Sequence, residues 1–542
     1  GVKRFVEGAD RGQGALFPEC LDVDPPGGAT TERSAAFGFG ASLPGGIGQC
    51  NLWMQLTASL LIDGVEHVRL QLLRELILSA TGSPRAIFEI GRRAAHRGEL
   101  DWAVKLYASA LNTCIKLHES PLIHGSDEIM ECMYNIEERS RPYWPLLLRL
   151  VAHELLANDL INHLHDFKTA HRVMMERLNL QKSSGLSSST LYLSDEWTRN
   201  IGHIGTLANL VKLQELGLSP WKQIVVAAKK QRVANAALLR QLSSHVQWIS
   251  DPEEVTRLEP LTILSGFRMT ALIEGFAAKP LTVVGEMECF AEAAWRNAGR
   301  SALLVLTEEQ REQARSLLAT LGIPKDAWIV CLHVREDSFH ASGSSQTHGS
   351  ANIVNYMAAI EGIAARGGWV IRMGDPAMSP APTHPRLIDW AHSSLRSAEG
   401  DVLLAGACRF AIAGNSGFVY LLYSFGRPII LSDAPITPGT GPFGPGCILL
   451  PKLIRQGDRP LSFKELFSPQ WREAAYSIRG LVAMGAQCVD NTPDEIAAAT
   501  EEMLDDQRSS REICDFSKSF VPEPPCTARI SKYFLRKHSE LL

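Results

Sequence analysis

The sequence predicts an α/β protein in which an all-α region is followed by two Rossmann-like domains that face a cleft. Up to about residue 180, apolar positions recur at helical spacing. Beyond that point, short apolar runs alternate with helical segments in two successive series, which is the rhythm of βαβ units in parallel sheets. We therefore expect a flexible leader over residues 1–50, a helical domain over 51–180, Rossmann-like domains over 181–325 and 326–508, and a tail over 509–542.

The bulk composition fits an ordinary globular protein. A hydrophobic share of 45%, a charged share of 21% and a formal charge of -5 give no support for nucleic-acid binding. The 11 cysteines are scattered without a CxxC pair, which indicates reduced thiols and a cytoplasmic protein. The longest apolar stretch, Val402 to Leu431, is interrupted by Arg409 and several glycines, so we expect no transmembrane segment. No signal peptide is visible, and because the chain begins with Gly1, a targeting segment before it stays open.

The helical region contains a segment, Ala86 to Leu111, that resembles a tetratricopeptide repeat. Small residues fall where two antiparallel helices must approach closely, namely Gly91, Ala95 and Ala103. Aligning Ala103 with Ala170 gives a separation of 67 residues, close to two repeats of roughly 34. Such a region would dock a protein partner or self-associate. The alternative is an ordinary bundle of helical hairpins.

The first α/β series has three short apolar runs that predict strands, at Leu191–Leu193, Ile224–Ala228 and Val246–Ile249. Between the first strand and the next helix, the segment Thr198 to Gly205 predicts a turn in which glycines let backbone N–H groups approach a ligand. His203 lies in this segment, where a neutral imidazole could take a proton from a hydroxyl. The alternatives are a tight turn that needs glycine for its backbone angles and a structural histidine.

The second α/β series predicts five buried strands alternating with helices. The strands are expected at Ile329–His333, Trp369–Met373, Leu387–Trp390, Phe410–Ala413 and Pro428–Leu431, and the helices at Tyr356–Arg366 and, with a capping box, Thr492–Leu504. Ligands bind outside the carboxyl ends of such strands, so the residues that follow them are the candidate site.

Two arginines stand at the ends of predicted neighbouring strands. Arg335 follows the first strand, and Arg372 ends the next one, before the turn Gly374-Asp375. Planar guanidinium groups suit a diphosphate, so the pair predicts a phosphate clamp. The alternative is that each arginine pairs with a nearby acid, Asp337 or Asp375.

The most specific pattern is the turn Gly414-Asn415-Ser416-Gly417 between a predicted strand and a helix. The first N–H groups of the helix and the Ser416 hydroxyl are expected to be free to hold phosphate or ribose oxygens. The alternative is a plain βαβ unit. The Pro/Gly-rich segment from Ser432 to Pro445 predicts a lid or a passive connection.

Taken as a set, these motifs resemble a little-characterised family of bacterial glycosyltransferases. The resemblance covers about residues 145–500 and rests on His333-Val-Arg335, Arg372 to Pro376, Arg409 to Gly417 and Pro451-Lys452. Members look like GT-B enzymes with a repeat-bearing N-terminal region. His-x-Arg is also similar to the motif of GDP-fucose-dependent transferases, which implies that Arg335 holds donor phosphate. Asn415 departs from the small hydroxyl residue expected there.

The resemblance implies transfer of a sugar from a nucleotide-sugar co-substrate to a glycan, lipid-linked or protein acceptor. No DxD-like sequence in a convincing context points to a metal, so stabilisation of the leaving phosphate by arginine is the simpler hypothesis. The candidate catalytic residues are His203, Asp337 and Arg335, and the candidate donor-binding residues are His333, Arg335, Arg372, Gly374, Asp375, Asn415, Ser416 and Gly417. The alternatives are a non-catalytic scaffold on a degenerate transferase fold and transfer of another group.

Overall fold

The computed structural model describes two compact units, which divide between Ser187 and Ser188. The described residues are 84–117, 144–164, 166–184, 189–265, 273–274, 281–282, 284–336, 350–434, 446–466, 468, 471, 478–506 and 529–541. The predicted leader over residues 1–50 lies outside them. The observed division lies seven residues beyond the predicted boundary at residue 180 (187 against 180), within the Ser/Gly-rich linker.

The described part of the first unit is all helical. Its helices are α4 (Pro84–His96), α5 (Leu100–Leu117), α7 (Trp144–Leu164) and α8 (Phe167–Ser183), and each packs against its neighbour in this order. A Cβ atom added to Gly91 would lie 2.7 Å from the ring of Tyr107, so the predicted close approach of α4 and α5 is confirmed. Arg92 binds the buried carboxylate of Asp159 at 2.8 Å, which ties α4 to α7. The tetratricopeptide-like repeat itself stays a prediction.

The second unit begins with a three-stranded parallel sheet. Its strands are β1 (Thr190–Leu193), β2 (Gln223–Ala227) and β3 (Val246–Ile249), in the order β1-β2-β3, which confirms the three predicted strands. The helices of this part are α9 (Ile201–Glu215), α10 (Ala236–Gln241), α11 (Pro252–Ser265) and α12 (Val284–Asn297). A two-residue antiparallel pair, β4 (Ile273–Glu274) with β5 (Leu281–Thr282), lies between α11 and α12 in the chain.

A larger, seven-stranded parallel sheet follows. Its order is β15-β11-β10-β9-β6-β7-β8, and the strands are β6 (Ile329–His333), β7 (Trp369–Arg372), β8 (Leu387–Asp389), β9 (Phe410–Ala413), β10 (Ile429–Ala434), β11 (Ile448–Pro451) and β15 (Arg529–Ile530). The chain enters at β6, adds β7 and β8 on one side, and then adds β9 to β11 on the other. The strand order therefore reverses between β6 and β9. The crevice at the carboxyl ends of these two strands is the topological switch point of the sheet.

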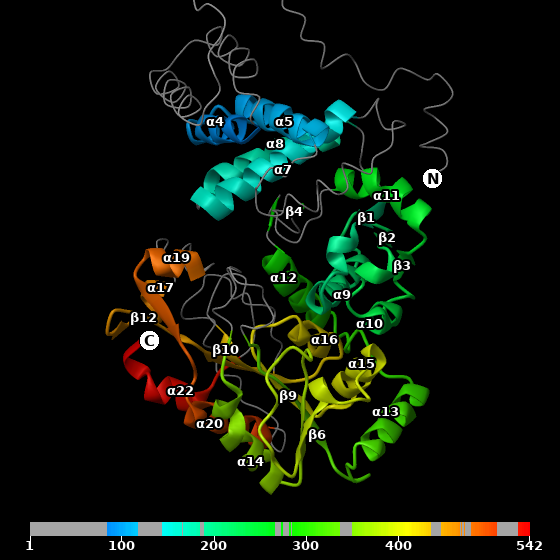
Figure 1. Cartoon of the computed structure of the whole chain (residues 1–542), viewed down its shortest axis with the longest axis vertical. Helices are drawn as coiled ribbons and strands as arrows, with labels where there is room; N and C mark the ends of the chain where they lie inside the picture. The colour runs from blue at the N-terminus through cyan, green and yellow to red at the C-terminus, as the bar shows by residue number, and fades with distance from the viewer. Residues whose placement is uncertain are drawn as a thin grey trace, which may run out of the picture. The chain divides into compact units, whose positions relative to one another are not determined.

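Helices cover both faces of the larger sheet (Figure 1). On one face lie α14 (Met357–Ala365), α20 (Pro493–Asp506) and α22 (Lys532–Lys537), and on the other lie α13 (Glu308–Thr320), α15 (Ala398–Ala407) and α16 (Phe418–Ser424). All residues of β6 and β9 are buried, as their unbroken apolar runs predict. The capping box of α20 is confirmed, because Thr492 N–H donates to Glu495 at 2.9 Å and Glu495 N–H returns to Thr492 Oγ1.

Two expectations about domain limits are corrected. Residues 529–541, assigned to a tail, supply β15 and α22, and Phe534 of α22 is fully buried. A two-residue strand has no period, so its sequence gives no signal. Helix α13 precedes residue 326 but packs on α15 of the larger sheet.

A small antiparallel sheet of β13 (Arg459–Pro460), β12 (Leu453–Gln456) and β14 (Ala486–Val489) is also present without having been predicted.

Candidate functional site

The residues that follow β6 and β9 meet at the switch point. The two strands pair in parallel, with His333 opposite Ala413, and Gly414 N–H donates to the carbonyl of His333 at 3.0 Å. Their carboxyl ends are therefore neighbours, as the sequence predicts for strands that carry a shared site. In open α/β sheets this crevice is where ligands bind.

Four of the predicted residues contact one another in this crevice. Arg335 Nη1 donates to the carbonyl of Asn415 at 3.1 Å, and Ser416 Oγ lies 3.1 Å from His333 Nδ1. The ring of His333 stacks on Phe418, with centroids 5.5 Å apart. The structure thus brings the His-x-Arg motif and the glycine-bounded turn into a single cluster.

His333 is a neutral hydrogen-bond partner in this cluster. Burial, together with the positive charges of Arg372 and Arg335, lowers the pKa of its imidazole to about 4. The ring is therefore uncharged at pH 7. His333 forms a hydrogen bond with the Ser416 hydroxyl, and Arg335 carries a positive charge beside it.

The helix after the turn differs from expectation. The N–H groups of Val419 and Tyr420 already donate to the carbonyls of Ser416 and Gly417, at 3.1 and 3.2 Å. The expectation that the first N–H groups of this helix are free is therefore wrong for these two. Helix α16 has 7 residues, so its dipole is short. A ligand at the switch point would rely on the side chains of Arg335 and Ser416.

The predicted turn with Gly202 and Gly205 is instead the start of a helix. Asn200 caps α9 by accepting the N–H of His203 at 3.0 Å, so both glycines are helical. A Cβ atom on Gly202 would lie 2.7 Å from Gly417 Cα, and one on Gly205 would lie 2.5 Å from Tyr420 Cβ. These glycines allow α9 to pack closely on α16, and this packing, not ligand approach, explains them.

We expect Gly205→Ala to lower the free energy of unfolding by about 1–3 kcal/mol, because its methyl group would overlap the backbone and Cβ of Tyr420. Urea denaturation measures the change. Gly362→Ala in α14 is the matched control, since its Cβ would meet only the movable end of Glu501. The control gains helix propensity of up to about 1 kcal/mol. Equal stability of both variants would contradict the packing argument.

His203 lies one residue from the contact between Gly202 and Gly417. Its Nδ1 is 2.6 Å from the carbonyl oxygen of Glu196. A carbonyl can only accept, so Nδ1 carries the proton of the neutral ring and the lone pair is on Nε2. The contact between Gly202 and Gly417 brings this helical turn of the first sheet's region beside the turn that follows β9.

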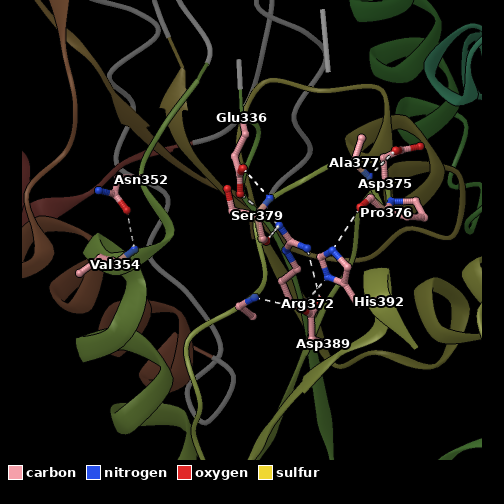
Figure 2. Close-up of polar contacts among 11 residues, drawn as sticks. Glu336, Asn352, Val354, Arg372, Asp375, Pro376, Ala377, Ser379, Asp389 and His392 are labelled. Atoms are coloured by element: carbon pink, nitrogen blue, oxygen red, sulfur yellow. Dashed lines mark hydrogen bonds and ion pairs between the residues drawn. The ribbon is translucent and has the colours of Figure 1, made fainter. Parts of the chain in front are cut away.

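Arg372 is placed differently from the predicted phosphate clamp. It is 0% exposed, and its guanidinium binds Glu336 at 3.1 Å, Asp389 at 3.3 Å and the carbonyl of Ser379 at 3.0 Å (Figure 2). Two carboxylates therefore balance its charge inside the protein. Pairing with acids was the alternative, but the partners are not the expected Asp337 or Asp375. A donor-binding role for Arg372 stays a prediction that this pairing does not favour.

The turn after β7 is stabilised internally. Asp375 accepts the N–H of Ala377 at 2.9 Å, and Gly374 has a φ of 152° beside the sulfur of Met378, where a side chain would overlap. These contacts shape the turn, and ligand binding by Gly374 and Asp375 stays a prediction. Asp337 lies outside the described residues, as does the predicted lid beyond Ala434.

A cavity of about 650 Å³ adjoins the switch point, and its charged lining residues were not among the predicted site residues. They are Glu336, Lys452 and Asp490. Glu336 directly follows Arg335, and Lys452 directly follows the buried strand β11. The rule that singled out Arg335, a charged residue after a buried strand, therefore also applies to Lys452.

The described residues offer neither a metal-binding cluster nor a helix that could span a membrane. No group of three or more His, Cys, Asp or Glu side chains among them is arranged to hold a metal ion. None of their helices is both long and apolar enough to cross a membrane.

Comparison with known proteins gives weak similarities. No protein-family model matches the chain, and no curated protein sequence matches it. A glycosyltransferase family 9 structure from Veillonella parvula is 12% identical, with a TM-score of 0.35, over 59% of this chain and 98% of that one. The Escherichia coli heptosyltransferase WaaC with ADP is 13% identical, with a TM-score of 0.26, over 48% and 90%. The same enzyme with ADP-2-deoxy-2-fluoro heptose is 15% identical, with a TM-score of 0.23, over 48% and 92%. Similarities this low carry no argument about function.

Proposed function

We propose that the chain is a bacterial, cytoplasmic glycosyltransferase that moves a sugar from a nucleotide-sugar donor to a glycan, lipid-linked or protein acceptor. The observation that carries the proposal is the clustering of Arg335, Ser416 and His333 at the switch point. A cation and a hydroxyl at that position suit a phosphate-bearing ligand. The resemblance of the His-x-Arg motif favours a hexose or fucose as the sugar.

In this proposal, Arg335 neutralises the leaving diphosphate. Its hydrogen bond to the carbonyl of Asn415 orients the guanidinium across the crevice before the ligand arrives. Ser416 donates its hydroxyl proton to a phosphate or ribose oxygen in the tautomer in which His333 Nδ1–H donates to Ser416 Oγ, because neither group is then left unpaired. No metal is required for the leaving group in this arrangement.

The acceptor would enter from the side of α9. The Nε2 lone pair of His203 is the candidate base for the acceptor hydroxyl if the reaction inverts configuration. Asp337 is the second candidate. Replacing His203 with Gln would then lower turnover with little effect on donor affinity, because glutamine cannot accept the proton.

The test measures thermal stabilisation of the full chain by GDP, UDP, CMP and dTDP, each free and as sugar conjugates. A ligand that binds only the folded state stabilises it by about 2.7 kcal/mol at a hundredfold excess over its Kd. We expect one nucleotide to stabilise the wild type and to lose most of this effect in Arg335→Ala, because the leaving phosphate then lacks its cation.

Arg455→Ala is the control, since Arg455 is an exposed arginine on β12 whose guanidinium binds the carbonyl of Asp458. It should keep the nucleotide response of the wild type. If no nucleotide stabilises the wild type, or if Arg335→Ala responds fully, the proposed donor site is wrong.

A non-catalytic scaffold is the second candidate. The observation that favours it is the separate helical unit, whose helices α4, α5, α7 and α8 pack in succession and could dock a protein partner or a second copy. In that case, Arg335→Ala would leave the cellular role of the chain intact.

A further inference from the structure

The cavity beside the switch point has the size of a ligand site. Its walls come from the segments after β6, β7 and β11, from residues 350–353, and from α19 (Ile478–Ala483) with β14. Its volume of about 650 Å³ falls among small-molecule pockets, which span roughly 300–1,000 Å³. Arg335 is not among the residues that line it. The cavity therefore adjoins the proposed phosphate position and does not include it.

The charges of the walls disfavour a phosphate inside the cavity. Lys452 is buried, and its Nζ lies 2.7 Å from Asp490 and 2.6 Å from the carbonyl of Ser350. The charge of Lys452 is therefore already balanced by Asp490, which also lines the cavity. Glu336 adds a second carboxylate, so an anion would face two negative groups and one paired lysine. A neutral group with hydrogen-bond donors fits better.

Glu336 presents acceptors at one side of the cavity. Its Oε2 accepts the N–H of Ser379 at 2.8 Å, and its Oε1 accepts from Arg372 at 3.1 Å. A carboxylate has about four lone-pair positions, of which these bonds use two. The side chain is 15% exposed. On the other side of Figure 2, Asn352 commits its oxygen to the N–H of Val354 at 3.0 Å, which leaves its NH₂ group as the donor end.

Apolar side chains also line the cavity. Leu481, Val482 and Ala486 line the cavity from α19 and β14, and Val482 is 67% exposed, which is high for a large apolar side chain. A site lined by both apolar side chains and hydrogen-bonding groups suits a ring that has a carbon face and a rim of hydroxyls.

Arg372 fixes Glu336 in this position. The fully buried guanidinium spans Glu336, the carbonyl of Ser379 and Asp389, and so joins the segments after β6 and β7 to the end of β8 (Figure 2). Asp389 is held in turn by the N–H of Ala381 at 2.9 Å and by His392 Nδ1 at 2.8 Å. The carboxylate of Glu336 therefore cannot turn away without breaking a buried network.

We propose that this cavity binds a neutral group with vicinal hydroxyls, as ribose and pyranose rings carry, through the carboxylate of Glu336, and that Arg372 positions that carboxylate. The hydroxyls donate to Glu336, and the carbon face of the ring packs on the exposed side chain of Val482. This inference rests on the proposed function for the source of the hydroxyls, which is the donor's ribose or a sugar ring.

The test measures binding to the full chain by calorimetry, without turnover. The probes are adenosine, guanosine, cytidine and uridine, their 2′,3′-dideoxy counterparts, the methyl glycosides of glucose, mannose and fucose, and inorganic pyrophosphate. We expect one diol-bearing probe to bind the wild type and to bind Glu336→Gln about tenfold or more weakly, because a charged acceptor is lost. A nucleoside that fails when its diol is removed identifies ribose, and a glycoside identifies a sugar.

The control is Glu361→Gln, an exposed carboxylate on α14 that should leave every Kd unchanged. The inference is overturned if no diol-bearing probe binds, or if Glu336→Gln binds the probe as tightly as the wild type. Pyrophosphate separates this failure from failure of the proposed function. Pyrophosphate binding that Arg335→Ala abolishes supports the donor site, whatever the cavity binds. If a diol binds and pyrophosphate does not, the cavity site is supported and the proposed donor site is not.

A double-mutant cycle tests the positioning role. Arg372→Lys keeps the charge but cannot span three acceptors, so we expect it to weaken the diol probe several-fold in the wild-type background. In the Glu336→Gln background, the same change should alter the Kd by less than about twofold, because Arg372 acts through Glu336. Equal weakening in both backgrounds would overturn the positioning role. A structural effect alone would not produce this dependence on Glu336.

Discussion

Arg372→Met is expected to lower the free energy of unfolding by about 3–5 kcal/mol, because removing one member of a buried ion pair leaves the others uncompensated. Arg372 is the cation between Glu336 and Asp389 and is 0% exposed. Burial raises the pKa of Asp389, but the hydrogen bonds from Ala381 and His392 and the charge of Arg372 outweigh burial and hold it below its ordinary value. Without Arg372, both carboxylates lose their shared partner.

Urea denaturation of the wild type and the variant measures this change. Arg366→Met is the matched control, because Arg366 forms an ion pair with Glu501 that is 30% and 41% exposed. An exposed pair contributes up to about 1 kcal/mol, so the control should stay within that range. If both variants lose the same small amount, Arg372 does not join the loops as the contacts indicate.

The sequence predicts the strands of the sheets better than it predicts the side-chain contacts of the site. Strands such as β6 and β9 lie inside the sheet, so both faces are apolar and the runs are unbroken. Strands β12 and β14 are half-exposed and carry mixed residues, so their pattern is not distinct from that of a loop. Burial on two faces therefore gives the clearest signal, although β3, which is partly exposed, was also predicted.

The site residues that directly follow buried strands were predictable from the sequence. Arg335 and Ser416 follow buried strands, and parallel pairing alone brings them together. The partner of Arg372 was not predictable, because Glu336 is 36 residues away and its orientation depends on side-chain packing. The glycines of α9 were misread for a similar reason. Their partners, Gly417 and Tyr420, lie at the start of α16 and within it, far along the chain.

A second buried network joins helices of the two sheets. Glu288 on α12 is 1% exposed, and it accepts hydrogen bonds from Thr206 of α9 at 2.6 Å and from Tyr420 of α16 at 3.1 Å. Burial raises the pKa of Glu288 more than these hydrogen bonds lower it, and the pKa lies at about 7. The nearby Lys212 is committed to Glu292 at 2.6 Å. Glu288 therefore keeps its proton in the folded state under mildly acidic conditions.

The consequence for stability has a definite sign. Between its ordinary pKa of 4.5 and about 7, Glu288 holds a proton when folded and releases it when unfolded. The free energy of unfolding therefore falls as pH rises through this window, by about 3 kcal/mol in total, and the contribution is constant outside it. Glutamine imitates the protonated side chain at every pH.

Glu288→Gln is accordingly expected to be more stable than the wild type above pH 7. The advantage of the variant should grow by about 2 kcal/mol between pH 5.5 and pH 8, because only the wild type ionises over that range. Urea denaturation at both pH values measures it. Glu309→Gln, at an exposed position on α13, is the control, and its difference from the wild type should not change with pH. A Glu288→Gln variant that is less stable than the wild type at pH 8 would show instead that Glu288 is ionised in the folded state and held by Lys212.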